Sequence, residues 1–138
     1  MKFMIIVKAT PDSEAGAMPE EKLIAEMAEY HEALAKAGML LDASGLQPTS
    51  KGWRIRYQGS DRTLIDGPFA ETKELIAGYT LIEAKSREEA LEWTRRFPNP
   101  AGNGKAAEIE VRQLFTLDDF EPSDAVTRFR ELETSLAK

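Results

Sequence analysis

The stretch "AGYTLIEAKSREEALEW", residues 77–93, decides the fold. Residues 77–84 form a short, mostly apolar run, which is typical of a β-strand inside a sheet. Ser86 and, three residues later, Glu89 form the signature of a capping box at the start of a helix, which we expect over residues 87–97. A strand that leads directly into an amphipathic helix predicts one β-α unit of a mixed domain.

The same pattern occurs earlier in the chain. Residues 2–8 form an apolar strand, and residues 19–37 carry apolar side chains at spacings of three and four, as in an amphipathic helix that ends at Gly38. A further strand is expected over residues 39–48, and the last one over residues 107–115. The order is therefore β-α-β followed by β-α-β.

Between the two units lies a predicted hairpin. Residues 53–58 alternate cleanly, so that Trp53 and Tyr57 share a face and suit a core or a dimer contact, and residues 63–66 form the returning strand. Without the hairpin, the order is that of the α+β ferredoxin-like split βαβ fold. The strands carry apolar residues on both faces, so we expect a second copy to cover the face that the helices leave open, giving a homodimeric α+β barrel.

The C-terminal segment is expected to be an extension of the domain. The domain is predicted over residues 1–116, and residues 117–138 form a helical extension that is associated with the dimer. Ser123 can cap a helix whose apolar stripe includes Phe129 and Leu132. The pattern fits packing on the same subunit as well as packing on the partner.

The composition argues against several classes of function. The net charge of -6 disfavours direct nucleic-acid binding, because an acidic protein repels the phosphate backbone. No run approaches the roughly 20 apolar residues of a membrane span. The chain has no cysteine and one histidine, which argues against a metal site. The lack of cysteine fits the reducing cytoplasm, where we expect the protein. We expect no cofactor.

The stretch "LIDGPFAETKEL", residues 64–75, is the first candidate site. Pro68 and Gly67 suit a rigid turn, and Asp66 can accept bonds from nearby backbone N–H groups, so a purely structural turn is the simpler interpretation. The turn does not explain the side chains that follow it. The candidate ligand-binding residues of this segment are Phe69, Glu71, Thr72 and Glu74.

Two further candidates lie elsewhere. His31 falls on the helix stripe that faces the sheet, where it is either a buried neutral histidine or a general base paired with a carboxylate such as Asp66 or Asp42. His31 and Asp66 are thus the candidate catalytic residues. Lys8 ends the first strand, and it is either solvated or a ligand-binding residue for an anion.

Three stretches of the chain form a recognisable pattern, namely "DGPFAETKE", "AGYTLIEAKSREEALEW" and "EIEVRQLF". It resembles the YCII-related family, in its DGPF-domain branch, over residues 1–115 or so. The resemblance implies a ferredoxin-like fold and a dimeric barrel. An enzymatic role has been suggested for the family from a histidine and an aspartate, and that histidine falls at the position of Met27 here, one helical turn before His31. Fusions of relatives to sigma-factor domains imply a link to transcription.

Two hypotheses for the function follow. The first is a cytoplasmic homodimer of unknown specificity that acts as a cofactor-independent enzyme or as a binding protein for a small polar or anionic molecule. The second is a non-catalytic dimer that binds a protein partner in transcription.

Overall fold

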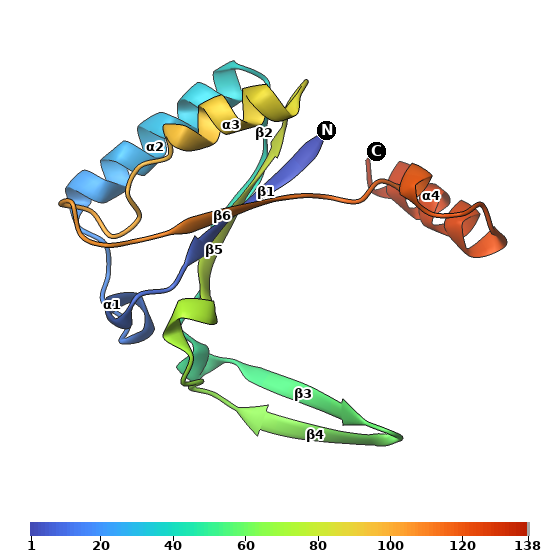
Figure 1. Cartoon of the computed structure of the whole chain (residues 1–138), viewed down its shortest axis with the longest axis horizontal. Coiled ribbons are helices and arrows are strands. Elements are labelled where there is room, and N and C mark those ends of the chain that lie inside the picture. Colours follow the sequence, from blue (N-terminus) through green and yellow to red (C-terminus); the bar gives the residue numbers. More distant parts are fainter. Residues whose placement is uncertain (138) are drawn as a thin grey trace.

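The computed structural model describes residues 1–137 as a four-stranded antiparallel sheet with a separate two-stranded hairpin and four helices (Figure 1). In chain order the elements are β1 (Lys2–Lys8), α1 (Pro11–Glu14), α2 (Glu21–Lys36), β2 (Leu40–Gly45), β3 (Trp53–Gln58), β4 (Asp61–Asp66), β5 (Ile76–Glu83), α3 (Arg87–Arg95), β6 (Ile109–Gln113) and α4 (Asp124–Leu136). Short 3-10 helices cover Thr49–Lys51, Thr72–Glu74 and Leu117–Asp119.

The main sheet has the strand order β2-β5-β1-β6, and β3 and β4 form a separate two-stranded sheet. Each neighbouring pair of the main sheet is antiparallel. Mixed α+β architecture with this order agrees with the predicted ferredoxin-like fold and its inserted hairpin. The strands lie within two residues of the predicted bounds, except that β2 is shorter at its end.

Helices α2 and α3 cover one face of the main sheet (Figure 1). The core lies between this face and the helices, and Ile5, Leu34 and Ile82 are its fully buried large side chains. The Tyr30 hydroxyl donates a hydrogen bond of 2.7 Å to the carbonyl oxygen of Trp93, which ties α2 to α3. Burial raises the pKa of Tyr30 to about 12, and Arg96 opposes the shift.

Helix ends agree with the predicted caps in part. Ser86 accepts a hydrogen bond from the Glu89 amide and Ser123 accepts one from Val126, as expected. The Glu89 carboxylate, however, accepts from the amide of Lys85 rather than from the cap residue itself, so the reciprocal half of the predicted capping box is wrong. Gly38 has a φ of 74°, which suits the end of α2.

Helix α1 is a single turn of helix just after β1. Thr10 and Ser13 cap it reciprocally, with the Ser13 amide donating to the Thr10 hydroxyl and the Thr10 amide donating to Ser13. This short helix holds Glu14 at a fixed place, half-buried, and Glu14 becomes important for the hairpin.

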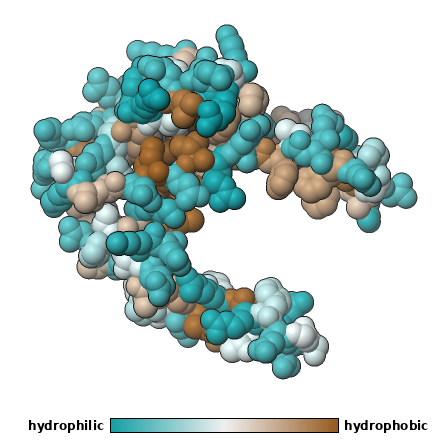
Figure 2. Space-filling model, viewed as in Figure 1, coloured by the Kyte–Doolittle hydropathy of each residue, from teal (hydrophilic) through white to brown (hydrophobic). Residues whose placement is uncertain are grey.

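The hairpin and α4 project from the main sheet away from α2 and α3 (Figure 1). On one face of the hairpin the apolar side chains are exposed, with Trp53 64% and Leu64 59% accessible. The stripe of α4 is exposed too, Phe129 by 58% and Leu132 by 57%. Figure 2 shows hydrophobic residues on the hairpin and around the sheet in the same view.

Candidate functional site

The predicted turn at residues 66–69 leaves β4 and docks against the chain just before β3. The Gly67 amide donates to the carbonyl oxygen of Gly52 at 3.0 Å. A Cβ atom on Gly67 would overlap the carbonyl oxygen of Thr49, so only glycine fits at this contact. The Gly67–Pro68 peptide bond is cis.

Thr49 links the turn to α1. Its hydroxyl donates to Glu14 Oε2 at 2.6 Å and accepts from the Phe69 amide at 3.1 Å, while its own amide donates to Glu14 Oε1 at 3.1 Å. The Arg54 guanidinium lies over the Phe69 ring, 3.8 Å from its centre. Glu14, Thr49 and Arg54 therefore fix the backbone and ring of Phe69 at the base of the hairpin.

Asp66 does not hold this turn in the way that the sequence suggested. Within residues 1–137 its carboxylate accepts no hydrogen bond from another protein group, and the side chain is exposed at the end of β4, opposite Trp53. The predicted Asx turn is therefore wrong, because Thr49 supplies the bond to the turn. The Asp66 carboxylate stays free for another partner.

The residues after the turn run towards the end of β1. Thr72 is half-buried in its 3-10 helix, and Glu71 and Glu74 are exposed. The Ala9 amide donates to the carbonyl oxygen of Leu75 at 2.9 Å. This bond joins the end of the polar segment to the end of β1, directly beside Lys8.

Lys8 lies on the face of the sheet opposite the helices. Its ammonium is 3.4 Å from Glu110 Oε1, and only 20% of its side chain is exposed. Glu110 also accepts from the Arg112 guanidinium at 3.2 Å. The hydrogen bond from Arg112 is the main cause that holds the pKa of Glu110 below its ordinary value, and the interaction with Lys8 is the next.

The face around Lys8 has an apolar centre. Strand register places Ile6 opposite Tyr79 and Met4 opposite Leu81, and all four are only partly buried. At the β2 edge, the Tyr79 hydroxyl donates to Asp42 Oδ2 at 2.9 Å. Asp42 and Tyr79 are polar groups of this face that sequence reasoning did not assign together. The alternation of β5 places Tyr79 there. A register shift between Leu40 and Asp42 brings Asp42 to the same face, and alternation along β2 gives no signal of it.

His31 lies on the other face of the sheet, between α2 and β5. Its Nδ1 is 2.7 Å from the carbonyl oxygen of Met27, and its Nε2 is 2.8 Å from the Thr80 hydroxyl. A carbonyl can only accept, so Nδ1 carries a proton, and in the tautomer with Nδ1 alone protonated Nε2 accepts from the Thr80 hydroxyl. Both ring nitrogens thus have partners, and within residues 1–137 no hydrogen bond or ion pair joins His31 to Asp66 or Asp42.

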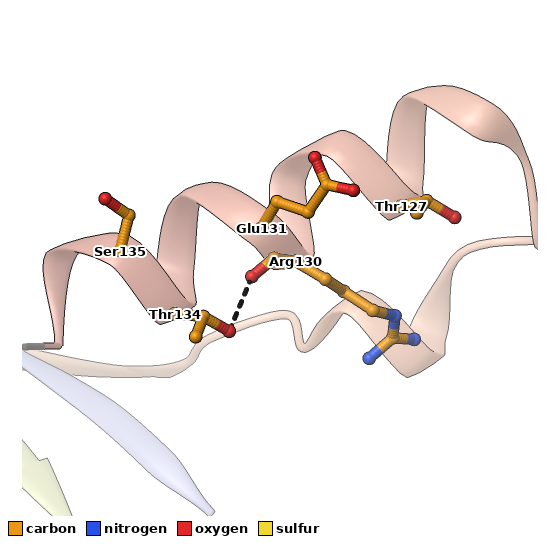
Figure 3. Close-up of a pocket in the computed structure, with 5 residues that line it drawn as sticks. All are labelled: Thr127, Arg130, Glu131, Thr134 and Ser135. Atoms are coloured by element: carbon orange, nitrogen blue, oxygen red, sulfur yellow. Dashed lines mark hydrogen bonds between the residues drawn. The ribbon is translucent and has the colours of Figure 1, made fainter.

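Two surface hollows lie at α4, away from these residues. One of about 370 Å³ is bordered on α4 by Thr127, Arg130, Glu131, Thr134 and Ser135 (Figure 3). Another, of about 170 Å³, lies where the chain enters α4. None of the predicted site residues borders either hollow. In the first hollow, the Thr134 hydroxyl donates a hydrogen bond to the carbonyl oxygen of Arg130 in the same helix.

Among the described residues, no group of three or more His, Cys, Asp or Glu side chains is placed to hold a metal ion. The same part of the chain contains no helix that is long and apolar enough to cross a membrane.

The model of the YCII-related domain matches residues 1–115. The chain belongs to the YCII-related family. A protein of Rhizobium meliloti (strain 1021), described as uncharacterized, is 33% identical over 95 residues, which cover 69% of this chain and 75% of the relative.

Among solved structures, this YCII-related chain is similar to 5-chloro-2-hydroxyhydroquinone dehydrochlorinase from Burkholderia phenoliruptrix AC1100, in complex with 2,5-dihydroxybenzoquinone. The match has a TM-score of 0.46 at 16% identity, and it covers 83% of this chain and 94% of that one.

Proposed function

We propose that this protein is a homodimer in which two sheets face each other and enclose a site for a small polar or anionic molecule. The observation that carries the proposal is the sheet face opposite the helices. It combines an apolar centre at Met4, Ile6 and Leu81 with Lys8, whose side chain is largely shielded even in the single chain.

Three exposed apolar surfaces support the dimer. A sheet that is apolar on both faces needs a second layer, and a two-stranded hairpin alone is only marginally stable in water. The hairpin and α4 present exposed apolar side chains, and the apolar side chains at the centre of the open sheet face are only partly buried. Interfaces of obligate dimers bury roughly 2,000 Å² or more in total, and an interface that joins all three surfaces is the one we propose.

The ligand site is proposed at the end of β1. Lys8 supplies a positive charge, and the segment from Phe69 to Glu74 adjoins it through the bond between Ala9 and Leu75. An ammonium that is partly removed from water attracts an anion more strongly than a solvated one. Phe69, Glu71, Thr72 and Glu74 are the proposed neighbours of the ligand.

The chemistry of the site is proposed without a cofactor. The free carboxylate of Asp66 suits a base or a ligand anchor. His31 stays a predicted catalytic residue, although its geometry gives it Met27 and Thr80 as partners rather than Asp66. The cytoplasmic location and the DGPF branch also stay predictions, and no contact favours the alternative of a partner in transcription.

Thermal melts with a panel of small anionic and neutral metabolites test this function. A ligand that binds only the folded protein raises its melting temperature. We expect an anionic compound to raise the melting temperature of the wild type and of Lys2→Gln, an exposed control on the same strand, but not that of Lys8→Gln.

A second variant tests Asp66. Asp66→Asn keeps the shape of the side chain and removes its charge, so the unliganded melt should barely change while the shift caused by the ligand is lost. If no compound shifts the wild type, the small-molecule function fails. If one compound shifts wild type, Lys8→Gln and Asp66→Asn equally, the proposed site fails.

A further inference from the structure

The two edge strands of the open sheet face differ in charge. β2 and β6 lie at opposite edges of the main sheet. On the open face, β2 presents the carboxylate of Asp42, whereas the β6 edge presents Arg112 and Glu110, with Lys8 of β1 beside them. One edge is therefore negative, and the other has a net positive charge.

The register places the two outermost charges in one row. Asp42 pairs with Leu81, Leu81 with Met4, and Met4 with Arg112. Asp42 and Arg112 therefore lie at the same height along the strands, on the same face, at the two ends of a row that runs across the sheet.

We propose that β2 of one subunit lies over β6 of the partner, and that Asp42 forms an ion pair with Arg112 of the partner subunit at each edge of the dimer. The proposal rests on the homodimer proposed above and specifies how its two sheets are oriented. The second copy of this chain is the occupant of the open face.

In a twofold dimer, two arrangements let the open faces of the two sheets pack on each other with their strands aligned. The twofold axis runs between the sheets, either along the strands or across them. An axis along the strands puts opposite edges together and keeps the height of each residue, so Asp42 meets the partner's Arg112. An axis across the strands puts each edge over its own copy with the heights reversed, so the negative β2 edge faces the partner's β2 edge and the net positive β6 edge faces the partner's β6 edge. Like charges held together disfavour the second arrangement.

Both side chains have free capacity for the pair. Asp42 accepts from the Tyr79 hydroxyl and from the amide of Ala43, which orients its carboxylate and leaves further acceptor positions. Arg112 bonds Glu110 through one nitrogen, and 71% of its side chain is exposed. Packed sheets lie about 10 Å apart, a distance that an arginine and an aspartate bridge between them. Such a pair acts mainly on orientation, because repulsion in the wrong arrangement is stronger than attraction at a solvated edge.

Sedimentation equilibrium of charge-reversed variants tests the pairing. We expect Asp42→Arg and Arg112→Asp each to raise the dimer dissociation constant about tenfold or more, because each change makes both edge pairs repulsive. The double variant Asp42→Arg/Arg112→Asp restores both pairs and should return the constant close to that of wild type. An equimolar mixture of the two single variants should dimerise again, since each edge then joins opposite charges.

Glu32→Arg, an equal change of charge at an exposed position of α2, is the control and should leave the constant unchanged. Circular dichroism melts establish that each variant is folded. If the wild type dimerises and the single variants match it, or if the double variant stays as weak as the singles, the edge pairing is overturned and the homodimer stands. A wild type that is monomeric at micromolar concentration overturns both proposals.

Discussion

The backbone of Gly67 lies against the carbonyl of Thr49 so closely that there is no room for a side chain between them. The contact joins two segments that flank the hairpin, one just before β3 and one just after β4. It closes the base of the hairpin and aligns Phe69 with Thr49.

Gly67→Ala should therefore destabilise the protein. The added methyl group meets backbone rather than a flexible side chain, so the turn has to move, and we expect a loss of about 3 kcal/mol in the free energy of unfolding. Gly52→Ala is a matched control, because its Cβ would lie 3.7 Å from the same carbonyl oxygen, an ordinary contact. Urea denaturation measures the free energy of unfolding of both variants. Equal losses for the two variants would contradict the role of the contact.

Thr49 itself offers a second prediction. Thr49→Val keeps the shape but leaves the Phe69 amide without its acceptor and Glu14 without its hydroxyl donor, and unsatisfied groups of this kind cost about 1–3 kcal/mol. Thr49→Ser keeps the hydroxyl and should lose much less. Chemical denaturation of the two variants checks this, and a Val variant as stable as the Ser variant would show that the hydroxyl does not hold the turn.

The periodic elements were predictable because their signals are local. The apolar alternation of β3 and the spacing of α2 come from neighbours a few residues apart. Packing against the main sheet keeps the pattern of α2, and pairing with β4 keeps that of β3. The strand order followed from the order of the elements. His31 was expected to face the sheet, and its bond to Thr80 confirms that orientation.

The attachment of the hairpin was not predictable, because it depends on residues far apart in the chain. Thr49 is 35 residues from Glu14 and 20 from Phe69, and no spacing rule links these positions. An isolated threonine after a proline gives no signal of its own. Asp66 was expected to hold the turn since aspartate often does so, but here a long-range hydroxyl replaces it.

The buried Tyr30 gives a prediction about pH. Its pKa is about 12 in the folded protein and 10.0 ordinarily, so between these values the unfolded chain loses the phenol proton while the folded chain keeps it. Ionisation then favours the unfolded state. The stability contributed by the neutral phenol is complete below pH 10 and is lost as the pH rises towards 12, on the order of 1–2 kcal/mol.

Tyr30→Phe is the comparison that isolates this effect. The variant loses the bond to Trp93 at every pH, but it has no phenol to ionise, so its stability should fall less steeply above pH 10 than that of wild type. Urea denaturation from pH 8.5 to 11.5 measures both slopes. Parallel curves for the two proteins would mean that Tyr30 does not titrate with a raised pKa.

The last prediction uses the chain's two tryptophans to report on the hairpin. Trp53 is 64% exposed on the apolar face of β3, whereas Trp93 is half-buried, with the Arg96 guanidinium 3.9 Å from the centre of its ring. If the partner covers the hairpin in the proposed dimer, Trp53 leaves water on association. We expect its emission to shift to longer wavelength when the protein is diluted below the dissociation constant of the dimer. Trp53→Phe leaves only Trp93, whose emission should not change on dilution, and Trp93→Phe should keep the shift. Emission from Trp53 that is independent of concentration, while light scattering reports dissociation of the dimer, would show that the hairpin lies outside the interface.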